Sequence, residues 1–318
     1  MHIGIKSWIK RVLEGYRNGG MKFVLTKFFW WYVGFFITIS SRKHIGTNIF
    51  EKDWDMVIIL DACRVDAMRE VANEYSFIDS VGEYYSVGST SNEWIAKTFT
   101  RKFMKDINET NYVTSNLFGK KVLEDREFPP IRHPYVPLSF ANWNTVDISD
   151  LNHFEPVWQY AEHAGSGGFP ARPVTDRSIQ LCRGELASSR TIVHYMQPHS
   201  PYIAVDEPIK KKYNNNDIDK EEVWNAYLDN LRYVLEEVEI LINNVDAEKV
   251  VITADHGEAF DEWGFRGHTL GNPIPEVKKV PWVETTAHDT KSHNPQTENK
   301  KKLTDDEIES RLSYLGYK

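Results

Sequence analysis

Two apolar stretches far apart in the chain each end in an acidic residue, and this feature most constrains the fold. The segment MVIILDACRVD, residues 56–66, delivers Asp61 at the end of an apolar run. The segment VVITADHGE, residues 250–258, places Asp255 and His256 after a run of β-forming residues. Ligands of open α/β sheets collect at the carboxyl ends of strands. We therefore expect two buried strands whose ends build one metal site.

The rest of the chain alternates between strand and helix patterns. Further strands are expected at residues 84–87, 191–196 and 280–283, and helices at 65–74, 91–103 and 221–243. This alternation is typical of an α/β fold with a largely parallel central sheet and helices on both faces. Residues 104–190 are less regular and are expected to form insertions that wall the site.

Composition divides the chain into three parts. Residues 1–50 are expected to form a basic and aromatic helical segment, and residues 51–284 the catalytic domain. Residues 285–318 are expected to be a polar linker followed by a short helix, because the sequence TDDE at 304–307 matches a capping box.

Charge is distributed unevenly between these parts. Residues 1–45 hold eight Lys or Arg and one acid, Glu14, which gives +7; since the whole chain carries −8, the remainder carries −15. An acidic body of this kind argues against nucleic acid as a partner.

The N-terminal segment contains the uncharged aromatic run at residues 28–41, which is 14 residues long. A transmembrane helix needs about 20 apolar residues. Three alternatives remain: a helix packed on the domain, a membrane-surface anchor formed by residues 1–45, and a true span, which is the least favoured. We accordingly expect the protein to be cytoplasmic or peripheral to a membrane.

Hydroxyl groups follow the strand expected at residues 84–87. In SVGSTSNEW, residues 86–94, Thr90 and Ser91 lie near the start of a helix, where free N–H groups and the helix dipole favour an anion. An ordinary helix cap is the alternative role. A hydroxyl beside a metal ion can ionise and attack phosphorus or sulfur.

Three histidines complete the candidate site. TIVHYMQPHSPY, residues 191–202, presents His194 and His199, and GFRGH, residues 264–268, presents His268. An imidazole in such a position can protonate a leaving oxygen or stabilise an oxyanion.

In this order, the segments ILDACRVDA, VGSTS, HYMQPHSPY, TADHGE with a downstream GH, and VPWV resemble the alkaline phosphatase superfamily, in its sulfatase-like branch. The resemblance covers residues 53–284 and implies an alkaline-phosphatase-like fold. It implies one divalent metal ion, with manganese or zinc favoured over magnesium or calcium. The metal ligands that it implies are Asp61, Thr90, Asp255 and His256.

The resemblance also implies roles in catalysis. Thr90 corresponds to the nucleophile, and His199 and His268 to residues that contact the transferred group or, in two-metal members, bind a second metal. Arg64, Ser91 and His194 are expected to contact the substrate, with a structural role as the alternative for Arg64.

The chain departs from formylglycine sulfatases in its nucleophile segment. It has Gly-Ser-Thr-Ser-Asn at residues 88–92 where those enzymes have Cys/Ser-x-Pro-Ser-Arg. It also has Asp-Ala at 61–62 where many sulfatases have Asp-Asp, and Gln197 before His199, which disfavours a complete second metal site. The segment is more similar to the Thr-nucleophile branch, which includes lipoteichoic acid synthases and phosphoethanolamine transferases.

The predicted function is therefore a metal-dependent hydrolase or transferase acting on phosphoesters, chiefly phosphodiesters, of a cell-surface lipid or glycan. Two alternatives stay open. One is a sulfuric-ester hydrolase acting on a sulfoester substrate, and the other is a non-catalytic binding or scaffold member of the same fold.

Overall fold

The computed structural model describes residues 5–43, 45–129, 140–159, 169–203 and 208–296. The helix expected near residues 304–316 therefore lies outside the described residues. The main sheet has seven strands in the order β2-β9-β6-β1-β5-β3-β4. Their bounds are β1 Met56–Leu60, β2 Gly82–Tyr85, β3 Thr110–Thr114, β4 His153–Pro156, β5 Arg190–Tyr195, β6 Ala247–Thr253 and β9 Lys279–Ala287.

The sheet is largely parallel, as the sequence predicts. Strand β1 pairs in parallel with β5 and β6, and β3 pairs in parallel with β5 and β4, whereas β9 runs antiparallel to β6 and β2. All five residues of β1 are buried, which is typical of a parallel strand covered on both faces. Two short strands, β7 Ala259–Phe260 and β8 Arg266–Gly267, form a separate pair.

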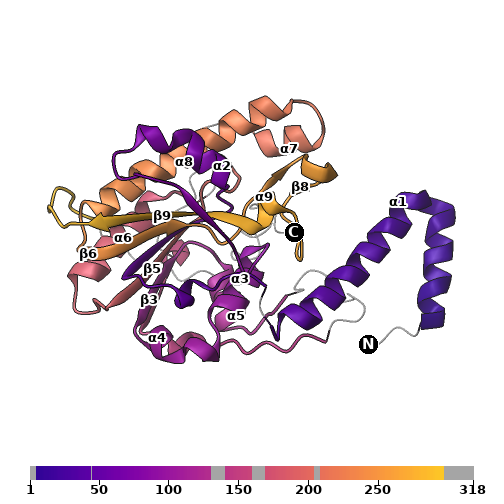
Figure 1. Cartoon of the computed structure of the whole chain (residues 1–318), viewed down its shortest axis with the longest axis horizontal. Helices are drawn as coiled ribbons and strands as arrows, with labels where there is room; N and C mark the ends of the chain where they lie inside the picture. Colours follow the sequence, from indigo (N-terminus) through magenta and orange to yellow (C-terminus); the bar gives the residue numbers. More distant parts are fainter. Residues whose placement is uncertain (1–4, 44, 130–139, 160–168, 204–207, 297–318) are drawn as a thin grey trace.

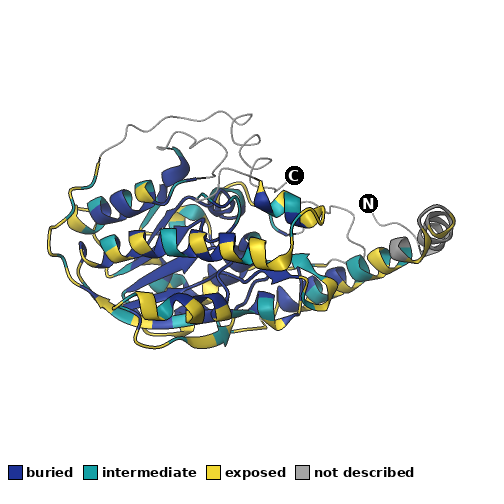
Figure 2. Ribbon diagram, turned by 90° about the horizontal axis from the view of Figure 1, so that it is seen from above, coloured by how far each residue is buried: buried dark blue, intermediate teal, exposed yellow. Residues whose placement is uncertain are grey.

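Helices cover both faces of the sheet (Figure 1). One layer contains α2 Val65–Val71, α6 Arg172–Arg183, α7 Ile209–Asn214 and α8 Lys220–Ile242, and the other contains α3 Ser91–Thr98, α4 Met104–Asn108 and α5 Phe118–Leu123. The short helix α9, Pro275–Lys278, precedes β9. Figure 2 shows the sheet buried between exposed outer helix surfaces, so the hydrophobic core is continuous through the domain.

The predicted helices and strands agree with the structure within a few residues, except in the segment predicted as irregular. That segment contains β3, β4 and α6. At the C-terminal end of the domain, β9 continues to Ala287. Beyond it, His293 Nε2 forms a hydrogen bond with Asp176 Oδ1 of helix α6, at 2.6 Å. The ordered body thus continues past residue 284.

The N-terminal helix α1, Ile5–Ser40, changes direction at Gly20, which has φ 61°. A positive φ of this size is accessible to glycine at little cost. The second half of α1 packs on the body through Val33, Ile37 and Leu270, which are all buried. Within the described residues, no helix combines the length and the apolar character that crossing a membrane requires.

Strand β1 is the centre of the core, and we predict that Ile58→Ala will lower the free energy of unfolding by about 2–5 kcal/mol. Ile58 is 0% exposed and lies between Val193 and Ile252 of the neighbouring strands. Urea unfolding measures the change. Leu186→Ala, at a position that is 51% exposed, is the control and should change the value by no more than about 0.5 kcal/mol. Equal losses in both variants would contradict the central position of β1.

Candidate metal centre and active site

The parallel pairing of β1 with its two neighbours brings the candidate ligands together. Asp61 follows β1, Asp255 and His256 follow β6, and His194 lies within β5, paired with Ile59. These four side chains are all 0% exposed. Strand ends that are separated by almost 200 residues in the chain therefore meet at one edge of the sheet.

Each carboxylate uses one oxygen for hydrogen bonds and directs the other toward the cluster. Asp61 Oδ2 accepts from Ser91 Oγ at 3.2 Å and from Asn116 Nδ2 at 3.0 Å. Asp255 Oδ1 accepts from the backbone N–H groups of Ala62, at 3.1 Å, and His256, at 2.9 Å. Among the described residues, Asp61 Oδ1 and Asp255 Oδ2 are buried without a hydrogen-bond partner.

The imidazole of His256 lies against both of these oxygens. Its Nε2 is 3.6 Å from Asp61 Oδ1 and 3.4 Å from Asp255 Oδ2. Its Nδ1 is 2.9 Å from the carbonyl oxygen of Gly257, and since a carbonyl only accepts, Nδ1 carries a proton. In the neutral ring Nε2 is then an acceptor that faces two other acceptors, an arrangement that a cation would stabilise.

His194 closes the cluster from β5. Its Nε2 is 3.9 Å from Asp255 Oδ2 and 4.0 Å from Asp61 Oδ2, and among the described residues it has no hydrogen-bond partner. Its Nδ1 contacts the hydroxyl of Tyr112 at 2.9 Å, which fixes the ring. Burial lowers the pKa of His194 to about 4, so the ring is neutral at physiological pH and able to bind a metal. The sequence assigned this residue to the substrate instead.

Burial and neighbouring charges shift the pKa values of the two carboxyl groups, Asp61 and Asp255. Burial, and then the negative charge of Asp255, raise the pKa of Asp61 well above its ordinary value. Burial also opposes ionisation of Asp255, but His256 and His194 hold its pKa below the ordinary value. Two carboxylates so close together resist holding two negative charges, and a divalent cation would remove that conflict.

These observations fit a resident metal ion. Two carboxylate oxygens and two imidazole nitrogens, all buried, converge without enough donors to satisfy them. A mixed set of oxygen and nitrogen ligands suits zinc or manganese better than calcium, which prefers oxygen alone. The residues that would hold the ion are Asp61, His194, Asp255 and His256.

The hydroxyl that adjoins this cluster belongs to Ser91, whereas the sequence predicted Thr90. Ser91 Oγ is 3.2 Å from Asp61 Oδ2 and 3.4 Å from His256 Nε2. Thr90 is the N-cap of α3: its Oγ1 contacts Asn92 Oδ1 at 2.5 Å and accepts from the N–H of Glu93 at 3.4 Å. Ser91 is buried, whereas Thr90 is partly exposed.

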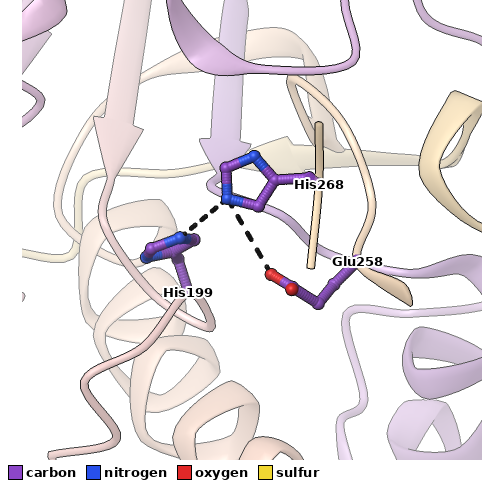
Figure 3. A group of neighbouring side chains, drawn as sticks. All are labelled: His199, Glu258 and His268. Atoms are coloured by element: carbon purple, nitrogen blue, oxygen red, sulfur yellow. Dashed lines mark hydrogen bonds and ion pairs between the residues drawn. The ribbon is translucent and has the colours of Figure 1, made fainter. Parts of the chain in front are cut away.

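A second group of ligand-type side chains consists of His199, Glu258 and His268 (Figure 3). His199 Nε2 and His268 Nε2 are 2.9 Å apart, and Glu258 Oε2 is 4.0 Å from His268 Nε2. The His268 ring stacks on that of His256, with centroids 4.2 Å apart, so the two groups form one continuous site. Sequence reasoning missed Glu258, although it belongs to the same DHGE segment as two predicted ligands.

The guanidinium of Arg64 is bound by acidic side chains and a backbone carbonyl of the protein. Its guanidinium donates to Asp66 at 2.8 Å from Nε, to the Glu258 carbonyl at 3.0 Å and to Glu262 at 3.0 Å. These partners occupy the donor directions that an anion would need. The geometry favours the structural alternative for Arg64, which joins the start of α2 to the loop that carries Glu258.

A buried charge network holds the first turn of α3. Glu93 contacts Lys97 Nζ at 2.5 Å and accepts from Ser89 Oγ at 2.6 Å, while Lys278 Nζ donates to the Gly88 carbonyl at 2.8 Å. Although burial opposes ionisation, Lys97 and then Lys278 hold the pKa of Glu93 at about 2. The segment that presents Thr90 and Ser91 is thus fixed by charged groups that have no access to water.

A close backbone approach holds the turn after His256. A Cβ atom at Gly257 would lie 2.1 Å from the carbonyl oxygen of Glu276, and the Gly257 N–H donates to the Val277 carbonyl at 2.8 Å. Only glycine fits at this distance, which explains the glycine in the DHGE segment.

Comparisons with solved structures give alignments of low sequence identity. The chain aligns with the soluble domain of lipooligosaccharide phosphoethanolamine transferase A from Neisseria meningitidis at a TM-score of 0.47 and 14% identity, covering 75% of this chain and 77% of that one. The periplasmic domain of EcEptC from Escherichia coli, in complex with Zn, aligns at 0.44 and 13%, covering 80% and 79%. A Vibrio parahaemolyticus protein described as belonging to the alkaline phosphatase superfamily aligns at 0.39 and 12%, covering 84% and 70%.

No family model matches the sequence, and no curated protein matches it. The alignment with the integral membrane protein lipooligosaccharide phosphoethanolamine transferase A from Neisseria meningitidis covers 48% of that chain. The chemistry is therefore inferred from the residues of the site itself.

We predict that manganese or zinc will raise the melting temperature of the wild-type protein by about 5 °C over its value in EDTA, because a ligand at about 100 times its Kd adds about 2.7 kcal/mol. Asp255→Asn should abolish this response. It should also make the metal-free protein somewhat less stable than wild type at neutral pH, because His256 and His194 favour the ionised carboxylate. Thermal scans with and without metal provide the measurement.

The matched control for this prediction is Asp53→Asn, since the Asp53 side chain is 75% exposed and pairs with Lys249 on the surface. This variant should keep the full metal response. A response that persists in Asp255→Asn would place the metal elsewhere.

Proposed function

We propose that this chain is a metal-dependent hydrolase or transferase of phosphoesters, with a phosphodiester of a membrane lipid or surface glycan as substrate. One observation carries the proposal: Asp61, His194 and Asp255 each offer a buried ligand atom within 4.8 Å of the other two, and His256 and a serine hydroxyl at the N-terminus of a helix lie against them. The family resemblance of the sequence motifs points to the same class of reaction.

When bound, a divalent cation at this cluster supplies Lewis acidity, which polarises a phosphoryl oxygen and makes a neighbouring hydroxyl more acidic. Ser91 is the hydroxyl in contact with the cluster, and its proton is directed to Asp61 Oδ2. Its oxygen attacks phosphorus, the bond to the leaving oxygen breaks, and the phosphoryl group becomes an ester of Ser91. The positive end of the α3 helix dipole would stabilise the negative charge of the phosphoryl group.

The His199–His268 pair is proposed to serve the leaving group. His199 Nδ1 donates to the Ser200 carbonyl at 2.5 Å, so the neutral ring has an acceptor at Nε2. The hydrogen bond between the two rings therefore carries its proton on His268 Nε2. Burial lowers the pKa of His199 to about 4, which keeps that ring neutral. This N–H of His268 is proposed to turn to the leaving oxygen and stabilise its charge by a hydrogen bond, while water supplies the proton that the leaving group takes up. Water or an acceptor alcohol then resolves the enzyme ester.

Thr90 is the second candidate for the nucleophile, as the sequence motif predicts. Its partial exposure favours it, since a substrate reaches an exposed hydroxyl more easily than the buried one of Ser91. A thiol nucleophile is disfavoured, because burial raises the pKa of Cys182 to about 11 and that of Cys63 further.

We predict that Ser91→Ala will reduce the hydrolysis of bis(p-nitrophenyl) phosphate by about 10³-fold or more, as loss of a nucleophile does. Thr90→Ala removes a helix cap, so it should cost about 1 kcal/mol of stability and change the rate by less than about tenfold. Steady-state kinetics with saturating metal, and circular dichroism to confirm folding, provide the measurements.

The other outcomes distinguish the alternatives. A large loss in Thr90→Ala alone would assign the nucleophile to Thr90 within the same reaction class. Faster turnover of p-nitrophenyl sulfate than of the phosphodiester would establish the sulfuric-ester alternative. Equal metal-dependent rates in wild type and both variants would exclude both hydroxyls as the nucleophile. No metal-dependent turnover at all would leave the scaffold alternative.

A further inference from the structure

The second half of α1 presents a continuous apolar stripe to solvent. Its members recur at alternating spacings of four and three residues, which places them on one face of a helix. They are between 39% and 61% exposed, and they are Met21, Leu25, Phe28, Tyr32, Phe35 and Ile39. In Figure 2 this helix extends from the body with exposed residues along its length.

The adjacent face of the same helix is covered by the protein. Val33 and Ile37 are 0% exposed and pack against Leu270, and Phe36 lies 3.2 Å from the position that a Cβ atom of Gly271 would take. The helix is therefore apolar on two faces, of which the body covers one. A helix with apolar residues all round is normally buried on all sides, so the exposed face calls for a partner.

Charge identifies the class of partner. The chain has no acidic residue between Glu14 and Glu51, and residues 1–45 carry +7 against −15 in the remainder. Arg17, Arg42 and Lys43 are exposed in this region. A second copy would bring two basic helices together and would be opposed by their repulsion. An anionic lipid surface complements both the charge and the aromatic side chains of the stripe.

We propose that the exposed stripe of α1, residues 21–39, docks in the interface of an anionic lipid bilayer. The helix lies in the plane of the surface, because its other apolar face stays packed on Leu270 and lipid cannot surround it. This proposal is independent of the chemistry of the active site.

The docked helix would hold the active site close to the lipid surface. Tyr32 donates to the Gly271 carbonyl at 3.1 Å, and the Gly271 N–H donates to Ser89 Oγ at 2.7 Å, one residue before Thr90. Lys97, in the network that fixes α3, donates to Ser40 Oγ at the end of α1 at 2.9 Å. Two direct paths of contact thus join the docking helix to the segment that carries the candidate nucleophiles.

Co-sedimentation of the full-length chain with vesicles tests the proposal. We expect wild type to sediment with vesicles of phosphatidylcholine and phosphatidylglycerol and to bind pure phosphatidylcholine much more weakly, with the difference reduced in high salt. The double variant Leu25→Ser with Phe35→Ser should bind the anionic vesicles at least about tenfold more weakly, because it removes exposed apolar contacts.

The matched control is Leu186→Ser with Tyr85→Ser, which removes two exposed apolar side chains from the body, 51% and 48% exposed. It should bind like wild type. Circular dichroism and thermal unfolding confirm that all variants fold.

Three results would overturn the proposal. The first is wild-type protein that stays in the supernatant, and the second is a stripe variant that sediments like wild type. The third is a wild-type dimer in analytical ultracentrifugation that the stripe substitutions dissociate, which would assign the face to a second copy.

Discussion

The structure depends on two carboxylates that are buried side by side where neighbouring parallel strands end. Burying like charges is costly unless each group is hydrogen-bonded or paired with a cation. Ser91 and Asn116 satisfy one oxygen of Asp61, and backbone N–H groups satisfy one oxygen of Asp255. The remaining oxygens face the histidine rings. A divalent cation held at this edge of the sheet would offset that cost.

The order of the strands and the buried ion pair between Glu93 and Lys97 explain why the hydroxyls of Thr90 and Ser91 lie beside that site. Because β1 lies between β5 and β6, Asp61 is flanked by His194 on one side and by Asp255 on the other. Helix α3 must then hold its N-terminus against the cluster. Glu93 and Lys97, both 0% exposed, fix that turn from behind. Breaking such a pair leaves an uncompensated buried charge, so the position of the turn is strongly specified.

Sequence predicted the strands of the site well but missed β3 and β4 at one edge of the sheet. Strands β1, β5 and β6 are runs of β-branched and apolar residues, and such runs are the clearest strand signal. Strand β3 has the sequence TNYVT, and its polar residues remove the apolar pattern by which a buried strand is recognised. Asn111 is buried only because its side chain donates to the Leu186 carbonyl at 2.9 Å and accepts from Asn152 at 2.6 Å. Those partners come from distant segments that no local pattern reveals.

The same limit decides which site residues could be found. Asn116 follows β3, so missing that strand meant missing the residue that donates to Asp61. The choice between Thr90 and Ser91 depends on where α3 begins, and one residue along a helix rotates the side chain by about 100°. Motif spacing identifies the turn that carries the hydroxyls, but the register of the helix start decides which hydroxyl faces the ligands. Contacts between distant segments, from Lys278 to the Gly88 carbonyl and from Lys97 to Ser40, help to fix that register, and a linear sequence does not encode them as a pattern.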